Sequence, residues 1–181
     1  MIALAEWASE SHPVAANKLH EQVSQAYIEW REDVYRYLLT IGLHPPQAQE
    51  ATQEVFMRLY ATLIKKDETI RNQRAWVFRV AHNLGLTIRL KESATLPFEP
   101  ELEATLPDRS RGAESNLIER EKLLRMHRAV ESLSPQQRQC LHLRADGLRY
   151  REIADATGVS ISTVAEFLRR AVTRLKRAVY E

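Results

Sequence analysis

The sequence contains a single cysteine, Cys140, so no disulfide can form within the chain. A chain without disulfides is typical of a reducing compartment, and we expect a cytoplasmic protein. Cys140 stands beside Leu141 in a helical pattern, and neither His127 nor His142 has the paired spacing of a zinc site. We therefore expect Cys140 in the core, with no metal or redox role.

Glycine and long apolar runs are also scarce. With five glycines the sequence offers no glycine-rich loop for a nucleotide phosphate, and no Ser, His and Asp order or close carboxylate pair stands out. We therefore predict a protein that is not an enzyme and needs no cofactor. No run of about 18 apolar residues occurs, so we expect no membrane insertion. The first residues carry Glu6 and Glu10 and no basic start, which argues against a secretory signal.

Charge is unevenly distributed, although the net charge is only +2. Residues 92–116 hold six acidic and two basic side chains, three prolines and no helical stripe, whereas residues 125–181 hold eleven basic and six acidic side chains. We interpret residues 92–116 as a flexible acidic linker, because a connection of this length is unusual inside a compact domain. The chain then divides into two small domains, residues 1–91 and 117–181, and the basic second one points to nucleic acid.

Three helices are expected before the linker. Apolar residues recur at helical spacing from about Val23 to Ile41, from about Gln47 to Ile64 and from Arg74 to Lys91. Residues 1–20 are expected to be frayed or only briefly helical, because Pro13 interrupts any early helix.

Two groups of side chains in these helices have a functional interpretation beside the ordinary structural one. Gln53, Glu54 and Arg58 lie away from the apolar stripe of the second helix, where they form either a solvated face or a docking surface for another protein. Trp76 and Phe78 of the third helix either stack on unpaired bases or pack in the core, and core packing is the better expectation for each taken alone.

Four helices are expected after the linker, which makes the predicted fold class all-α. The first runs from Asn116 or Leu117 to Leu133, and Ser134 with Pro135 ends it and caps a second helix over residues 135–145. Two more helices follow between Tyr150 and Lys176, with a tight turn at Gly158 and an N-cap at Ser160. This spacing indicates a helix-turn-helix.

The last helix has a buried stripe and an outward face of a different character. Val164, Leu168, Ala171 and Leu175 recur at helical spacing, while Ser162, Ala165, Glu166, Arg169, Arg170 and Thr173 fall largely on the other side. Five basic side chains and no acidic one lie between Phe167 and Tyr180: Arg169, Arg170, Arg174, Lys176 and Arg177. Such a face suits base edges and phosphates. The alternative is a helical hairpin with a solvated basic face.

The order of these elements resembles bacterial sigma factors of the sigma-70 class, in particular the short extracytoplasmic-function (ECF) group that has only domains two and four. The resemblance is carried by QEVFMRLY (Gln53–Tyr60), RAWVFRVAHNL (Arg74–Leu84), the stretch Glu131–Val164 and LRRAVTRLK (Leu168–Lys176). The helix-turn-helix taken alone would also fit a regulator similar to LuxR. The runner-up is therefore a stand-alone helix-turn-helix regulator with a helical sensing or dimerisation domain.

The resemblance implies two partners, core RNA polymerase and promoter DNA, and a possible third, an anti-sigma factor. Domain 1–91 would dock on the β′ clamp helices through Gln53, Glu54 and Arg58. The same domain would open the minus-ten element with Asn72, Arg74, Arg79 and Asn83. Domain 117–181 would touch the β flap and read the minus-thirty-five duplex through Ser162, Thr163, Glu166, Arg169, Arg170 and Arg174.

Three departures from the family pattern affect these expectations. Gln47, Glu50 and Ala51 stand where two aspartates and a leucine are common, so docking would use a different polar set. Ala165, Glu166 and Phe167 replace a common Lys-Ser-Arg, which implies an unusual promoter sequence in which Glu166 accepts from a cytosine amine and Phe167 meets a thymine methyl or packs within the domain. Thr87 replaces a common acidic residue near the end of the third helix.

Overall fold

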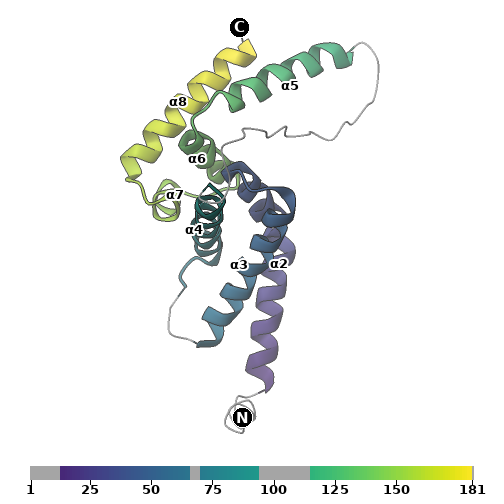
Figure 1. Ribbon diagram of the computed structural model, residues 1–181, viewed down its shortest axis with the longest axis vertical. Helices are drawn as coiled ribbons and strands as arrows, with labels where there is room; N and C mark the ends of the chain where they lie inside the picture. The colour runs from purple at the N-terminus through teal and green to yellow at the C-terminus, as the bar shows by residue number, and fades with distance from the viewer. Residues whose placement is uncertain (1–12, 66–69, 94–114, 181) are drawn as a thin grey trace.

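A computed structural model of the protein describes residues 13–65, 70–93 and 115–180, and these form α-helices with connecting turns and no strand (Figure 1). The helices are α2 (Pro13–Ile41), α3 (Pro45–Lys65), α4 (Gln73–Ser93), α5 (Ser115–Glu131), α6 (Pro135–Ala145), α7 (Tyr150–Thr157) and α8 (Ile161–Tyr180). The all-α prediction is confirmed. Within the described ranges no helix has the length and apolar content needed to cross a membrane. Most of the predicted linker, residues 92–116, lies outside these ranges.

Helix α2 is longer at its beginning than the apolar pattern predicted. It starts at Pro13 and not near Val23, so the expectation of a frayed or only briefly helical chain up to residue 20 is wrong for residues 13–20. Proline is accepted in the first turn of a helix, because its missing amide hydrogen has no intrahelical partner there and its φ angle is already helical. The same rule explains Pro45 and Pro46 at the start of α3, which begins two residues before the predicted start at about Gln47.

Helices α2, α3 and α4 pack against one another, with α2 and α3 side by side (Figure 1). Gly85 allows α4 to approach α2 closely, because a Cβ atom at this position would stand 3.0 Å from Ile41 Cδ1 and 3.1 Å from Leu38 Cδ2. Arg89 at the far end of α4 donates from Nη1 to the carbonyl oxygen of Ile41 at 2.8 Å, which satisfies a backbone acceptor at the end of α2. The buried residues of this group include Val34, Leu38, Ile41, Val55, Leu59, Val77, Phe78 and Ala81.

Capping residues mark three helix boundaries that the sequence predicted: the start of α6, the end of α7 and the start of α8. The Ser134 hydroxyl accepts from the Gln137 amide at 3.2 Å, and the Gln137 side chain accepts from the Ser134 amide at 3.2 Å, which forms a capping box before α6. Gly158 ends α7 at a φ angle of 72°, a left-handed conformation that glycine adopts without strain. Ser160 caps α8 by accepting from the Thr163 amide at 3.1 Å.

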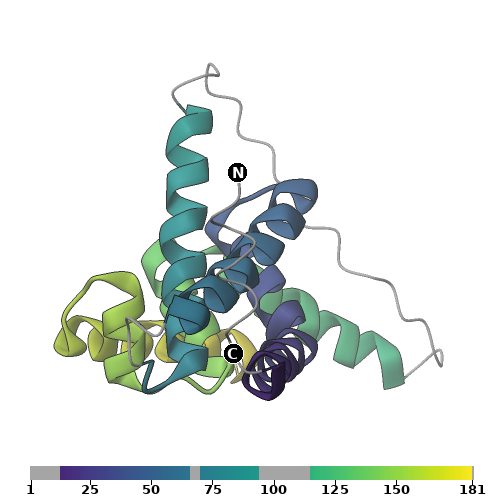
Figure 2. The same cartoon turned by 90° about the horizontal axis from the view of Figure 1, so that it is seen from below.

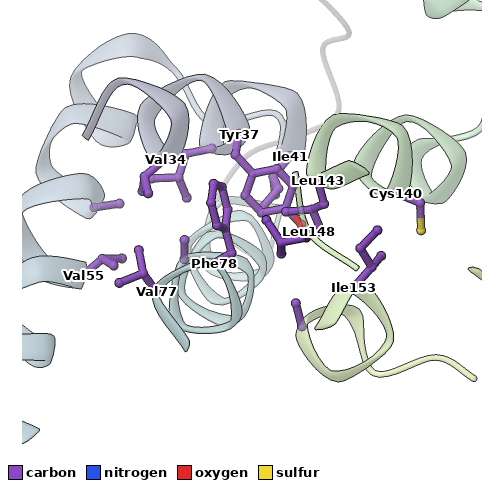
Figure 3. Packing of buried hydrophobic residues seen from close by; sticks show 14 of the residues in the cluster. Val34, Tyr37, Ile41, Val55, Val77, Phe78, Cys140, Leu143, Leu148 and Ile153 are labelled. Carbon is purple, nitrogen blue, oxygen red and sulfur yellow. The ribbon is translucent and has the colours of Figure 1, made fainter. Parts of the chain in front are cut away.

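The two groups of helices meet where α2 and α4 contact α6 and α7. Tyr37 of α2 lies at this junction beside Leu143 and Leu148, as Figure 3 shows, and its ring centroid is 5.7 Å from that of His142 in α6. Tyr37 and Leu143 are completely buried, and the buried residues of both groups form one continuous hydrophobic cluster. The division into domains 1–91 and 117–181 stays a prediction.

Polar side chains at this junction contact one another, and we call them the polar junction: Asp33 pairs with Arg36 and Arg74, and His142 faces Thr40 and Asp146. The Thr40 hydroxyl donates to the Arg36 carbonyl oxygen at 3.0 Å, so its oxygen accepts from Nδ1 of His142 at 3.1 Å. The proton of a neutral His142 is then on Nδ1, so Nε2 carries a lone pair and no hydrogen. This atom faces Oδ2 of Asp146 at 3.3 Å, and both atoms are buried without a hydrogen-bond partner.

Burial moves the pKa values of this pair in opposite directions. Loss of solvent lowers the pKa of His142 to about 4, and the charge of Arg36 adds to that effect while Asp33 opposes it. Loss of solvent raises the pKa of Asp146 to about 6, with Asp33 adding to the effect and with Arg36 and Arg74 opposing it. Near neutral pH the junction therefore holds a charged carboxylate that faces an imidazole lone pair.

We predict that Asp146→Asn stabilises the protein at pH 7.5 and has much less effect at pH 4.5. The folded protein raises the pKa of Asp146 from 3.8 to about 6. Its charge therefore costs stability above pH 6, and that cost disappears as the pH falls toward 3.8. The cost is at most about 3 kcal/mol, and the asparagine amide would also donate to Nε2 of His142. Urea unfolding at the two pH values measures the change.

Asp155→Asn is the matched control, because Asp155 is exposed on α7 and its replacement removes the same charge without relieving burial. Equal effects of the two substitutions on the free energy of unfolding at pH 7.5 would show that Asp146 carries no burial cost.

Candidate nucleic-acid interface

Helix α8 presents a polar and basic face opposite its buried stripe. Val164, Leu168 and Ala171 are buried against the other helices, so side chains on the opposite side of α8 point outward. Each residue of that side is at least partly exposed. The structure thus places together all six residues of α8 that the sequence analysis assigned to DNA: Ser162, Thr163, Glu166, Arg169, Arg170 and Arg174.

Glu166 binds two of the arginines on this face. Its carboxylate accepts from Nε and Nη2 of Arg169, both at 2.8 Å, and from Nε of Arg170 at 2.5 Å. These hydrogen bonds lower the pKa of Glu166 to about 2, so the carboxylate stays charged at any working pH. Any group that Glu166 or the two guanidinium groups bind must compete with this internal cluster.

A hollow on the same side joins α8 to the beginning of α6. It is lined by Gln137, Arg169, Arg170, Thr173, Arg174 and Arg177. Gln137 and Arg177 were not among the predicted site residues, although Arg177 lies three residues beyond Arg174 on one helix face and could have been found from that spacing. Arg174 donates to the Ser132 carbonyl oxygen at 2.6 Å, which fixes its position beside α5. Several guanidinium groups around one hollow suit phosphate groups.

Phe167 is partly buried and packs against the hydrophobic cluster. Of the two roles considered for it, packing within the domain is the one that this position favours.

Three of the four DNA residues predicted at α4 lie on one side: Arg79 and Asn83 within the helix and Asn72, which caps it. Asn72, Arg79 and Asn83 are separated by seven and four residues, and Trp76 lies between them on the same side. Trp76 is partly buried, whereas Phe78 is completely buried, so the expected core packing is confirmed for Phe78. A partly exposed indole between polar side chains is suited to base stacking.

Asn72 has both ends of its side chain engaged. Its Oδ1 accepts from the Ala75 amide at 3.0 Å, so Asn72 caps α4. Its Nδ2 donates to Oε1 of Glu152 in α7 at 2.6 Å. The predicted strand-binding asparagine is therefore in contact with the helix-turn-helix.

Arg74 lies on a different side of α4 from the other three. It donates to Asp33 of α2 at 2.9 Å, and its guanidinium carbon is 5.9 Å from the centre of the Phe78 ring. A separation of two residues from Asn72 turns a side chain through more than half a turn of the helix, which explains this position. Arg74 joins α4 to α2 here, and a direct contact with DNA would first require the ion pair to open.

Helix α3 has an exposed face that contains the three predicted docking residues, Gln53, Glu54 and Arg58. Arg58 donates to Glu54 at 2.7 Å, a pair on the helix surface. Met57 stands among them with 68% of its surface exposed, and the sequence analysis missed it. A large apolar side chain surrounded by polar ones is typical of a protein contact, because methionine is enriched at such interfaces.

Cys140 is 1% exposed, and burial raises the pKa of its thiol to about 11, so the predicted core position is confirmed. Among the residues that the structure describes, no group of three or more His, Cys, Asp and Glu side chains is placed to hold a metal ion.

Two family models match the chain in the same order as the two helical groups. Residues 26–94 match sigma-70 region 2, and residues 123–175 match sigma-70, region 4. The chain is 24% identical to the ECF RNA polymerase sigma factor SigK of Mycolicibacterium vanbaalenii. The alignment spans 162 residues and covers 88% of this chain and 82% of that protein. It is 25% identical over 155 residues to the ECF RNA polymerase sigma factor SigM of Bacillus subtilis, covering 85% of this chain and 93% of that protein.

Solved structures agree with these matches at the level of the fold. The sigma factor RpoE in complex with the anti-sigma factor NepR from Bartonella quintana has a TM-score of 0.65 at 20% identity, covering 88% of this chain and 97% of that one. CnrH in complex with the cytosolic domain of CnrY has a TM-score of 0.58 at 19% identity, covering 91% of this chain and 94% of that one. Regions 2 and 4 together, with relatives that span most of the chain, show that this protein belongs to the sigma-70 family of RNA polymerase sigma factors, in its ECF group.

Proposed function

We propose that this protein is a dissociable promoter-specificity subunit, which binds core RNA polymerase and directs transcription initiation at its own set of promoters. The observation that carries the proposal is the presence of regions 2 and 4 in one chain, each with an exposed polar face of the right character. A stand-alone regulator would account for the helix-turn-helix of α7 and α8. It would not account for a region 2 match over residues 26–94.

The two DNA surfaces would have different tasks. The outward face of α8 enters the major groove of the minus-thirty-five element, which is wide enough to admit a helix, while the arginines around the hollow contact phosphates. The side of α4 that carries Asn72, Trp76, Arg79 and Asn83 holds unpaired bases of the minus-ten element. Stacking and hydrogen bonds to base edges are the means by which extruded bases are bound.

The exposed face of α3 would dock on the β′ clamp helices, with Met57 at its centre, and the helices of region 4 would contact the β flap. The polymerase makes the RNA, so the protein needs no chemistry or cofactor of its own and works in the cytoplasm where the polymerase is. An anti-sigma factor, such as the one bound to the Bartonella quintana sigma factor, is a further possible partner.

In vitro transcription with purified core polymerase tests this proposal. Genomic fragments that include the region upstream of its own gene serve as templates, with and without the protein. Start sites that depend on the protein support the proposal and give the promoter sequence. Tight duplex binding without any association with polymerase would instead establish the regulator.

We predict that Met57→Glu weakens binding to core polymerase about tenfold or more, because an exposed apolar anchor at the centre of an interface carries much of its binding energy. Fluorescence anisotropy of labelled protein titrated with core polymerase measures the loss. Ile28→Glu is the matched control, since Ile28 is 69% exposed on α2 and Met57 is 68% exposed on α3. Equal losses of affinity for core polymerase in the two variants would show that Met57 is not part of the docking surface.

We predict that Arg170→Ala weakens binding of the polymerase complex to minus-thirty-five duplexes. The loss should be about 1–3 kcal/mol and confined to the cognate sequence if Arg170 reads a base, and even across sequences if it contacts phosphate. Binding to matched and mutated duplexes at fixed salt measures it. Unchanged affinity for every duplex would exclude Arg170 from the interface.

We predict that Glu166→Gln lowers sequence discrimination by raising the affinity for non-cognate duplexes. The neutral amide releases Arg169 and Arg170 from a charged carboxylate, so both become available to phosphates of any sequence. The ratio of cognate to non-cognate affinity, measured at several salt concentrations, should fall, and the salt dependence should become steeper. If neither changes, Glu166 is a solvated surface acid.

A further inference from the structure

We propose that Leu86 and Leu90 of α4 contact thymine bases of the promoter through their C5-methyl groups. The inference rests on the proposed role of α4 in holding unpaired bases. It adds two specificity-determining residues to that role, and it names the chemical group that they recognise.

The two leucines continue the side of α4 that we propose holds the DNA strand, which we call the strand side: Asn72, Trp76, Arg79 and Asn83. Leu86 follows Asn83 by three residues and Leu90 follows it by seven, and both separations return a side chain to the same face of an α-helix. Val77 and Ala81 lie on the opposite, buried side of the helix. The strand side therefore continues along α4 almost to its end at Ser93.

Both leucines are accessible to a partner. Leu90 is 70% exposed and Leu86 is 38% exposed. Figure 2 shows that the second half of α4, the long teal helix, extends away from α7 and α8. A single exposed leucine is ordinary on a protein surface. Two leucines in line with the polar residues of the strand side instead indicate that they share its partner.

The charge of α4 indicates that this partner is DNA. From Gln73 to Lys91 the helix carries four basic side chains and no acidic one. Its one acidic residue, Glu92, accepts a hydrogen bond from Gln47 of α3. The docking face of α3 differs, because it carries an acidic and a basic side chain that pair with each other. Apolar side chains among positive charges of one sign are suited to a nucleic acid, whose phosphates are complementary to them.

The leucine side chain limits the part of a base that it can recognise. Leucine has no hydrogen-bond donor or acceptor, so it cannot read the hydrogen-bonding edge of a base. Thymine carries a methyl group at C5, and apolar side chains contact this group in base recognition. Leu86 and Leu90 are four residues apart, which is about 6 Å along the helix axis. This distance fits thymines one or two positions apart, since stacked bases in a strand are about 3.4 Å apart.

Replacement of thymine by uracil tests the contact, because uracil differs from thymine only in lacking the C5-methyl group. Promoter fragments carry uracil at one thymine position at a time, within and beside the minus-ten element. Each fragment is titrated with the complex of full-length protein and core polymerase. We expect the wild-type complex to bind about two- to fourfold more weakly at one or two positions, as for the loss of one buried methyl group. Equal affinity for all fragments would overturn the proposal.

Leu86→Ala and Leu90→Ala test whether these two residues hold the methyl groups. Each substitution should weaken binding to the thymine fragment about two- to fourfold and remove the effect of uracil at one position, because the methyl group there has lost its partner. Ile28→Ala is the matched control, since Ile28 of α2 is 69% exposed and Leu90 is 70% exposed. It should keep the wild-type effect of uracil at every position. If both leucine variants also keep that effect at every position, the proposal is wrong.

Two measurements without DNA distinguish the thymine contact from other partners of Leu90. Fluorescence anisotropy gives the affinity of Leu90→Ala for core polymerase, and urea unfolding gives its stability. We expect both to match those of Ile28→Ala. A lower affinity for polymerase would assign Leu90 to a protein contact, and a lower stability would show that another part of the chain covers it. Either result would overturn the proposal.

Transcription assays separate this inference from the proposed function. Start sites that require the wild-type protein, together with equal affinity for thymine and uracil fragments, would refute the thymine contact and leave the function intact. Absence of any start site that depends on the protein would refute both.

Discussion

The burial of Tyr37 is the constraint on which the arrangement of the helices depends. Its phenol oxygen lies 2.8 Å from Nδ1 of His82 in α4, and its ring contacts both Phe78 of α4 and His142 of α6. Burial raises the pKa of Tyr37 and lowers that of His82, so both stay neutral and share one hydrogen bond. One side chain of α2 thus fixes the positions of α4 and α6, and α7 follows from α6 through a turn of four residues.

Local features of the fold could be predicted from the sequence, whereas contacts between distant segments could not. Ser134, Gly158 and Ser160 end or begin helices through contacts with residues close to them in the sequence. These helix boundaries can therefore be predicted without knowledge of the tertiary packing. Pro13 misled the prediction because the apolar pattern before Val23 is weak, and proline is compatible with both a helix interruption and a first turn. The bond between Asn72 and Glu152 spans 80 residues, and periodicity shows that a helix has an apolar side without showing which helix covers it.

The same distinction applies to the candidate site. The outward face of α8 could be predicted because its buried stripe fixes the opposite side. Arg74 was grouped with Asn72 by the resemblance, although a spacing of two residues already places them on different sides of a helix. Met57 was missed although it lies four residues after Gln53 and three after Glu54, a spacing that places it on the same predicted face of α3. Exposure of a large apolar residue becomes informative only when the packing is known.

Two acidic residues accept hydrogen bonds from side chains on the surfaces that we propose bind DNA, and they would limit DNA binding by the protein alone. Glu166 binds Arg169 and Arg170 of α8, and Glu152 accepts from the Asn72 amide at the beginning of α4, so each surface that we propose binds DNA carries a carboxylate of the protein itself. A sigma factor that bound duplexes tightly without polymerase would occupy promoters unproductively. When polymerase holds both surfaces at the spacing of the two promoter elements, two modest contacts become one strong one, because the second binds at a high effective concentration. If the two surfaces bind DNA weakly as separate sites, promoter binding depends on the polymerase.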